Sequence, residues 1–288
     1  MDKHIKWIFT LPAVIFVSIM MAYPLIYTFR ISFYEWSMSS VSAPKWVGLN
    51  NYTSLLQDER FWDSLWITFY YTSASLFIEM ILGVGIALLF FRGFKWDQGA
   101  KTVLMLPMVA TPVAISMVWM LIYEPTMGIA NRFITALGFE PLEWLGSTSQ
   151  VIPSLIIIDV WQWTPMIAIL VIAGLTTLPQ DPYESAAIDG ASALQKLMYI
   201  TLPLLRPTII VALVLRLVEL LKQFDVIYST TMGGPASASE TMNLLSYITA
   251  FEYFKMGSAS ALLMMFFVLV IGLILLLLWI RKRLGVQL

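Results

Sequence analysis

The sequence predicts an all-α, polytopic membrane protein with six transmembrane helices, and three observations support this fold class. The chain of 288 residues is 59% hydrophobic and 12% charged, with a mean hydropathy of +0.80, far more apolar than a soluble domain. Its apolar residues gather in six stretches, each near the roughly 20 residues that cross a bilayer as a helix. Lys and Arg are concentrated in alternate connections between those stretches.

Several of the predicted spans contain proline, which membrane helices tolerate when packed neighbours satisfy the freed backbone groups. The spans cover residues 7–29, 66–91, 103–123, 151–174, 204–226 and 258–280. The prolines within them are Pro12, Pro24, Pro107, Pro112 and Pro165. No internal repeat is visible, which argues against a transporter built from inverted halves. We expect residues 1–288 to form a single transmembrane domain.

The amino-terminal stretch begins with Lys3 and Lys6 and continues as an apolar run, an arrangement shared by secretory signal peptides. The run extends from Trp7 to about Thr28, which is too long for the core of a signal peptide, and no small-x-small cleavage site follows. The sequence therefore predicts a first helix that is retained in the membrane.

Lys and Arg predict the orientation, because loops rich in these residues stay on the cytoplasmic side. With a cytoplasmic amino terminus, ten lie inside: Lys3, Lys6, Arg92, Lys95, Lys101, Lys196, Arg206, Arg281, Lys282 and Arg283. Five lie outside: Arg30, Lys45, Arg60, Arg132 and Lys255. The sequence thus predicts that both termini and the 178–203 loop are cytoplasmic.

Several classes of function are disfavoured by what the sequence lacks. The chain has no Cys and a single His, His4, so it offers neither thiolate metal sites nor a histidine-based catalytic relay. It has no Gly-x-x-x-x-Gly-Lys-Ser/Thr segment, so we expect it not to hydrolyse ATP itself. A net charge of −1 gives no reason to expect a nucleic-acid partner. The sequence predicts a non-catalytic chain that binds no metal or cofactor of its own.

The 178–203 loop is more elaborate than a connection between two spans requires. Asp181 is predicted to cap a short helix, with Pro182 at the first helical position and Glu184 completing a capping box. Gly190 should end this helix. The loop is therefore expected to fold rather than simply to link two spans.

A second short helix is predicted to begin at Ser192, with Gln195 completing its capping box, and to stop near Pro203, where span five begins. One side of the loop has only small side chains, so the backbone of another protein can approach it closely. These residues are Ala186, Ala187 and Ala191. The alternative is a self-contained linker in which Glu184 only caps its helix. Both can hold, because capping leaves this side of the loop free.

The motif in this loop resembles a known family. Glu184-Ser185-Ala186, three residues, Gly190, nine residues and Ile200-Thr201-Leu202-Pro203 resemble the EAA loop of bacterial ABC importer permeases. One departure is Ser185, where the pattern has its first Ala; Ser is small, so we expect docking to survive. Asp189-Gly190-Ala191 and Leu204-Leu205-Arg206-Pro207 extend the resemblance toward the carbohydrate-uptake branch.

Other segments carry the resemblance across nearly the whole chain. They are Trp46-Val47-Gly48-Leu49-Asn50-Asn51-Tyr52, Leu106-Pro107, Glu124-Pro125 with Gly128 and Asn131, Asp159-Val160-Trp161-Gln162-Trp163-Thr164-Pro165, Gly233-Gly234-Pro235 and Gly257-Ser258-Ala259-Ser260-Ala261. The resemblance is closest to the first of the two paired permeases in maltose-type and glycerol-phosphate-type importers. It implies a type I ABC importer permease fold in the bacterial inner membrane.

The resemblance also implies partners. The loop would be the coupling helix that docks in a cleft of a cytoplasmic ATPase dimer, and that dimer would bind ATP and Mg. A second homologous permease, an extracytoplasmic solute-binding protein and membrane lipid complete the implied set. The solute would be sugar-like: an oligosaccharide, a polyol, a sugar derivative or a glycerophosphodiester.

The implied coupling residues are those of the motif: Glu184, Ser185, Ala186, Ala187, Asp189 and Gly190. In the family pattern, Glu184 pairs with a basic group of the ATPase and Gly190 provides the bend. Asp189 could equally cap the second helix.

Charged and amide residues in span five are the second candidate site. An ionisable group near the bilayer centre costs roughly 2.5–3.5 kcal/mol on insertion scales, so such groups persist when paired or facing a polar cavity. At about 100° per residue, Arg216, Glu219 and Gln223 share a ~60° arc. Lys222 lies to one side and Asp225 opposite. Two interpretations stay open: an Arg216–Glu219 pair that neutralises itself, or a hydrophilic wall for a hydroxyl-rich solute.

Glu79 in span two and Asp159 in span four are the other intramembrane acids. We expect structural hydrogen bonds from both rather than solute contact, although contact with solute stays open. These acids also support an alternative function, an ion-coupled secondary transporter with Glu79, Asp159 or Glu219 as a proton relay. That alternative gives the structured loop no role. An intramembrane enzyme is disfavoured, because no nucleophile–base pair is apparent.

Overall fold

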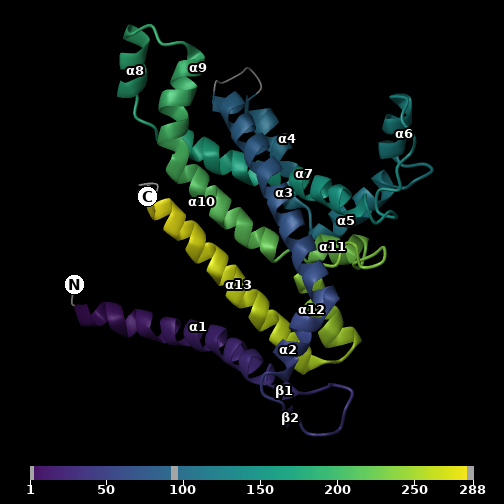
Figure 1. The fold of residues 1–288 in the computed structure, drawn as a ribbon. Coiled ribbons are helices and arrows are strands. Elements are labelled where there is room, and N and C mark those ends of the chain that lie inside the picture. Colours follow the sequence, from purple (N-terminus) through teal and green to yellow (C-terminus); the bar gives the residue numbers. More distant parts are fainter. Residues whose placement is uncertain (1–2, 92–96, 284–288) are drawn as a thin grey trace. The chain divides into compact units, whose positions relative to one another are not determined.

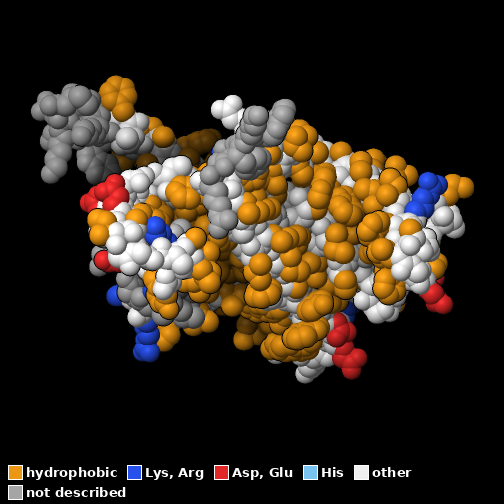
Figure 2. All heavy atoms as spheres, turned by 90° about the horizontal axis from the view of Figure 1, so that it is seen from above, with side chains coloured by type: hydrophobic (Ala, Val, Ile, Leu, Met, Phe, Trp, Pro, Cys, Tyr) orange, Lys and Arg blue, Asp and Glu red, His pale blue; other side chains and the backbone are white. Residues whose placement is uncertain are grey.

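The computed structural model describes residues 3–91 and 97–283, and these are mostly helical (Figure 1). They form two compact units, Met1–Asp63 with Met242–Leu269 and Ser64–Thr241 with Val270–Leu288. Hydrophobic side chains cover most of the face seen in Figure 2, and charged side chains are few. That surface suits contact with lipid and with other membrane helices.

The first unit contains α1 (Lys3–Ile31), α2 (Asn50–Gln57), the start of α3 (Glu59–Phe91), α12 (Met242–Tyr247), a π-helical turn (Ile248–Glu252) and the first half of α13 (Met256–Arg283). A short antiparallel pair, β1 (Tyr34–Glu35) and β2 (Lys45–Trp46), is the only sheet that the described residues form. The all-α prediction holds apart from this pair.

Asn51 and Gly257 hold the connection after α1 against the start of α13. The Asn51 amide donates to the carbonyl oxygens of Ser32 (2.8 Å) and Tyr34 (3.0 Å). The Gly257 N–H donates to the Trp36 carbonyl (3.2 Å), and a Cβ at position 257 would lie 1.9 Å from the Tyr34 oxygen. Only glycine fits this close approach, which explains why glycine begins the 257–261 segment.

The second unit contains the rest of α3, then α4 (Asp97–Val109), α5 (Pro112–Ile122), α6 (Ile129–Ala136), α7 (Val151–Thr176), α8 (Asp181–Ile188), α9 (Ala193–Lys196), a π-helical turn (Leu197–Thr201), α10 (Leu202–Leu221) and α11 (Asp225–Thr230). Helix α7 is central: it packs against α4 and α10, and it is the most buried candidate span. At Gly174 a Cβ would lie 2.6 Å from Thr208 Oγ1 of α10, so the two helices approach closely there.

The predicted third span, 103–123, is not one continuous helix in the structure. Helix α4 ends at Val109 and α5 starts at Pro112, and the two are bent by 99°. Pro112 has no backbone N–H and disfavours helical geometry at Thr111, which is extended (ψ 145°). The chain therefore restarts its helix at Pro112.

The prediction of a fifth span over 204–226 is also wrong at its end. Helix α10 ends at Leu221, and α11 begins anew at Asp225. Among the described residues, four helices are long and apolar enough to cross a membrane, or five if the bent α4–α5 pair counts as one span. Helix α10 is not among them, because it carries Arg206, Arg216 and Glu219. Of the charges that predicted orientation, Arg92 and Lys95 lie outside the described residues.

Candidate functional site

Helices α8 and α9 form a hairpin at one end of the second unit, beyond the end of α7 and the start of α10 (Figure 1). No residue of α8 is buried. The predicted capping box from Asp181 to Glu184 is wrong: α8 starts at Asp181 with Gln180 before it, and no side chain caps it. Gln180 already has helical angles, and its carbonyl accepts from Tyr183 and Glu184 N–H. The exposed Glu184 carboxylate makes no cap bond.

Gly190 ends α8, as predicted. Its φ of +73° is left-handed, and nothing lies within 4 Å of a Cβ built there. The Gly190 N–H donates to the Ala187 carbonyl (3.2 Å) and the Ala191 N–H donates to the Ala186 carbonyl (2.8 Å). These two bonds make a Schellman motif, in which glycine allows the turn that satisfies the last carbonyls of a helix. The bend is thus built by the backbone.

The predicted second capping box is confirmed. Gln195 N–H donates to Ser192 Oγ (3.3 Å), and Ser192 N–H donates to Gln195 Oε1 (2.7 Å). The predicted stop near Pro203 is wrong, because α9 runs through the π-helical turn into α10. In that turn Leu202 N–H donates to the Leu197 carbonyl, five residues back. Pro203 has no N–H to donate, and the π-helical turn directly before it changes the hydrogen-bonding pattern from four to five residues.

Tyr183 ties the hairpin together. Its hydroxyl donates to Thr201 Oγ1 (3.0 Å), and Thr201 Oγ1 donates to the Lys196 carbonyl (3.3 Å). This chain of bonds links α8 to the π-helical turn that leads into α10. Helix α8 is therefore braced against the segment that leads into α10.

Large apolar side chains protrude from the hairpin, a feature that the motif-based prediction missed. Ile188 is 87% exposed, Leu194 is 67% exposed and Tyr199 is 79% exposed. Apolar residues in an otherwise polar loop were the available signal. These exposed apolar side chains distinguish the hairpin from an ordinary polar loop.

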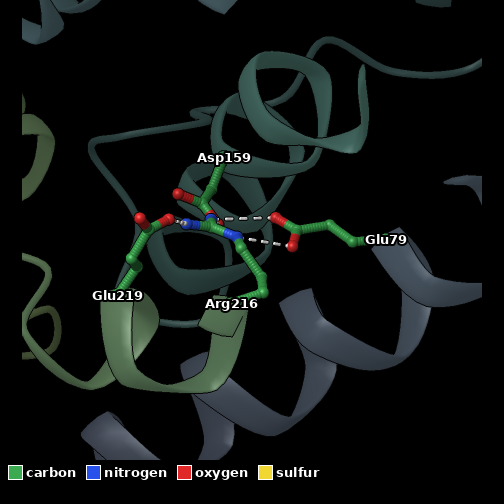
Figure 3. Close-up of polar contacts among 4 residues, drawn as sticks. All are labelled: Glu79, Asp159, Arg216 and Glu219. Atoms are coloured by element: carbon green, nitrogen blue, oxygen red, sulfur yellow. Dashed lines mark hydrogen bonds and ion pairs between the residues drawn. The ribbon is translucent and has the colours of Figure 1, made fainter. Parts of the chain in front are cut away.

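The intramembrane charges converge on Arg216 of α10 (Figure 3). Its Nε donates to Glu79 Oε2 of α3 (2.7 Å), and its Nη2 donates to Glu79 Oε1 (3.0 Å) and to Asp159 Oδ2 of α7 (2.5 Å). Its Nη1 donates to Glu219 Oε2 (3.4 Å). The guanidinium also lies 5.1 Å from the ring centre of Trp163. Three helices thus meet at one cation.

Arg216 does not line an open hydrophilic wall, which was one of the two interpretations of span five. The Arg216, Glu79 and Asp159 side chains are at most 2% exposed, whereas Glu219 is 42% exposed. The predicted Arg216–Glu219 pair is present, but the shorter contacts are with Glu79 and Asp159, from helices far away in sequence. Arg216 therefore connects three helices through buried contacts, and Glu219 is the member of the cluster that is accessible.

The predicted stripe of Arg216, Glu219 and Gln223 is wrong in its last member. Gln223 lies after α10 has ended, Lys222 occupies the capping position and Asp225 starts α11. Lys222 and Asp225 are exposed. These three residues lie beyond the end of the helix rather than along one of its faces.

Buried hydroxyl groups of α3 extend the polar layer beside Arg216, and the sequence analysis missed them. Tyr71, Thr72 and Ser75 are at most 1% exposed and precede Glu79 on the helix. Their hydroxyl groups, with Gln162 Oε1 and Asp159 Oδ1 of α7, have no hydrogen-bond partner within the structure. Ser75 lies one helical turn before Glu79, and Thr72 and Tyr71 lie about two turns before it; this spacing was the available signal. No group of three or more potential ligands in the described part of the chain could hold a metal ion.

Residues 79–286 match the family described as binding-protein-dependent transport system inner membrane component. The chain belongs to this family. The match covers the hairpin and the Arg216 cluster, and it supports a permease subunit of an ABC importer. It gives no support to an ion-coupled secondary transporter.

Curated relatives agree over nearly their whole length. The trehalose/maltose transport system permease protein MalF of Thermococcus litoralis is 34% identical over 94% of this chain and 91% of its own. The sulfoquinovosyl glycerol transport system permease protein SmoG of Agrobacterium fabrum is 30% identical over 93% and 87%. For both relatives, the alignment covers most of each chain, so the similarity is not limited to one segment.

A solved structure confirms the type I importer fold. One chain of a bacterial ABC transporter involved in the import of the acidic polysaccharide alginate superimposes with a TM-score of 0.85 over 97% of this chain and 95% of that chain. The sequence identity is 22%, so the likeness concerns the fold. The described residues thus have the backbone arrangement of an importer permease.

Proposed function

We propose that this permease forms half of the translocation pathway for a sugar or sugar derivative, in an importer driven by a separate ATPase dimer. The observation that carries the proposal is the α8–α9 hairpin, an exposed, bent and internally braced element at the end of α7 and α10. MalF and SmoG are permeases of a trehalose/maltose transport system and a sulfoquinovosyl glycerol transport system, which supports the solute class.

The remaining partners follow from the same family. A second homologous permease would complete the pathway, and an extracytoplasmic binding protein would deliver the solute; a related alginate transporter is solved with a periplasmic protein bound to an alginate pentasaccharide. The ATPase dimer would bind ATP and Mg. Both termini would lie in the cytoplasm of a bacterial cell, on the same side as the hairpin, as the Lys and Arg distribution predicts.

Each predicted residue has a place in this proposal. Glu184 would pair with a basic group of the ATPase, and the small residues Ser185, Ala186 and Ala187 would let the two backbones approach. Gly190 would hold the bend, with Asp189 at the helix end. On the pathway, the accessible candidates are Glu219, Lys222, Gln223 and Asp225, which can hydrogen-bond to hydroxyl groups. Arg216, Glu79 and Asp159 would hold the helices behind them.

Transport by the reconstituted importer tests the power source. In proteoliposomes that contain this permease, its partner subunits and the binding protein, we expect uptake of a radiolabelled glucoside disaccharide to require ATP. An uncoupler should leave the uptake unchanged, because no ion gradient drives it. Uptake that continues without ATP and stops with an uncoupler would overturn the proposal and favour ion coupling.

Glu184 and Asp181 form a matched pair for testing the docking surface, since both are exposed acids on α8. Glu184→Ala should reduce both copurification of the ATPase and solute uptake by about ten-fold, the effect of losing a charged contact of roughly 1.4 kcal/mol. Asp181→Ala should reduce neither by more than about two-fold. Equal effects of the two substitutions on ATPase copurification would show that Glu184 has no specific partner.

A further inference from the structure

Helix α6, in the connection between α5 and α7, exposes an apolar face. Ile129 is 69% exposed, Phe133 is 66% exposed and Leu137, which follows the helix, is 57% exposed. Their spacing of four residues places them within an ~80° arc on one side. Asn131 lies on the opposite side and is buried. The helix is therefore amphipathic with its apolar side outward, the reverse of a helix on a soluble domain.

Asn131 fixes the polar side of α6 through all of its side-chain hydrogen-bonding groups. Its amide nitrogen donates to the carbonyl oxygens of Pro125 and Leu142, each at 2.9 Å. Its amide oxygen accepts from Leu142 N–H (3.0 Å) and Trp144 Nε1 (2.8 Å). These four bonds prevent α6 from turning its apolar side inward.

Trp144 attaches this assembly to the ends of two membrane helices. Its ring stacks on Tyr123 at the end of α5, with 4.7 Å between ring centres. Ser154 Oγ in the first turn of α7 donates to the Trp144 carbonyl (3.0 Å), and Tyr123 Oη donates to the Ser154 carbonyl (3.1 Å). The chain between Tyr123 and Ile129 is short and reaches at most about 20 Å. Helix α6 is thus held close to the amino-terminal end of α7, a candidate membrane span.

We propose that the apolar face of α6 lies in the lipid interface, in the leaflet opposite the α8–α9 hairpin, with Ile129, Phe133 and Leu137 among the acyl chains. Because α6 lies near the end of α7, a candidate membrane span, lipid is available to cover its apolar face. The neighbouring α5 also exposes apolar side chains at a spacing of four residues: Val113, Met117 and Leu121. Lipid is the solvent that accommodates such a surface on a membrane protein.

Charge favours lipid over a docking protein. Arg132 is exposed and lies about 60° from Ile129 around the helix, where its long side chain can reach a lipid phosphate while its methylenes follow the apolar face. The arc from Ile129 to Leu137 has no acid or amide. A surface that binds a protein reversibly has a polar rim, whereas an apolar stripe beside a cation is typical of interfacial helices.

Collision accessibility of a spin label tests the proposal, and the chain suits it because it contains no Cys. Single nitroxide labels would be placed at Phe133→Cys and, as the matched control on the opposite side of α6, at Thr135→Cys. The complete importer would be reconstituted in bilayers of phosphatidylcholine and phosphatidylglycerol, without and with the binding protein. Oxygen concentrates in acyl chains, whereas a nickel chelate stays in water.

In the absence of the binding protein, the label at position 133 should collide more often with oxygen than with the chelate, and the label at position 135 should show the reverse. Adding the binding protein should change neither ratio. A label at position 133 that collides mainly with the chelate until the binding protein is added would assign this face to that protein. Low collision rates with both reagents would assign it to another permease subunit. Either result would overturn the proposal.

Discussion

Arg216→Met is expected to lower the free energy of unfolding by about 3–5 kcal/mol, because it leaves the buried carboxylates of Glu79 and Asp159 without their cation. The same substitution removes the contact that joins α3, α7 and α10. The effect is measured by heating the detergent-solubilised importer and recording, by gel filtration, the fraction that remains monodisperse. Arg216→Lys should recover only part of it, because an ammonium group cannot bond both Glu79 oxygens in a fixed plane.

Two substitutions of the same kind control for this prediction. Glu79→Gln removes a fully buried charge that makes two bonds to Arg216, at 2.7 and 3.0 Å, and should destabilise strongly. Glu219→Gln removes a charge that is 42% exposed and 3.4 Å away, and should cost less than about 1 kcal/mol. If Arg216→Met and Glu79→Gln both unfold at the temperature of the unmodified protein, the cluster does not hold the bundle together.

Gly257→Ala is expected to cost about 3 kcal/mol or more, at the upper end of what overpacking costs. A Cβ at position 257 would lie 1.9 Å from the Tyr34 carbonyl oxygen and 3.3 Å from the Asn51 amide nitrogen. A backbone oxygen cannot rotate away, so the connection after α1 must move. We expect a lower yield of folded protein and faster proteolysis of the 32–57 segment.

Gly272→Ala is the control on the same helix, since nothing lies within 4 Å of a Cβ there. Replacing glycine by alanine in a helix should stabilise by up to about 1 kcal/mol. Equal folded yields for the two variants would contradict the close approach of Gly257 to Tyr34.

The α8–α9 hairpin was largely predictable because its determinants are local. Gly190 ends a helix, and Ser192 with Gln195 starts the next, through bonds between residues at most five positions apart. The cap at Asp181 was mispredicted for an equally local reason, because Gln180 is already helical and the helix starts one residue earlier than expected. Local patterns therefore place helix ends to within a residue or two.

The broken spans were less predictable. Pro112 in a continuous apolar run is compatible with either a tolerated kink or a new helix start, and the packing of α4 on α7 and of α5 on α11 decided for the latter. The end of α10 at Leu221 likewise has no sequence signal as strong as a proline or glycine. Hydropathy detects only a continuous apolar run. It therefore predicts one span where packing divides the chain into two helices.

The sequence by itself determined that this chain is a membrane permease with a folded loop between two of its helices, because composition, apolar runs and a motif with fixed spacing are properties of adjacent residues. The tertiary structure decided which charges meet. Glu79 and Asp159 lie 137 and 57 positions from Arg216, and only the packing of α3, α7 and α10 brings them to one guanidinium. Pairing in a low-dielectric core depends on distance in space, so the sequence could supply the charged residues without showing that they are partners.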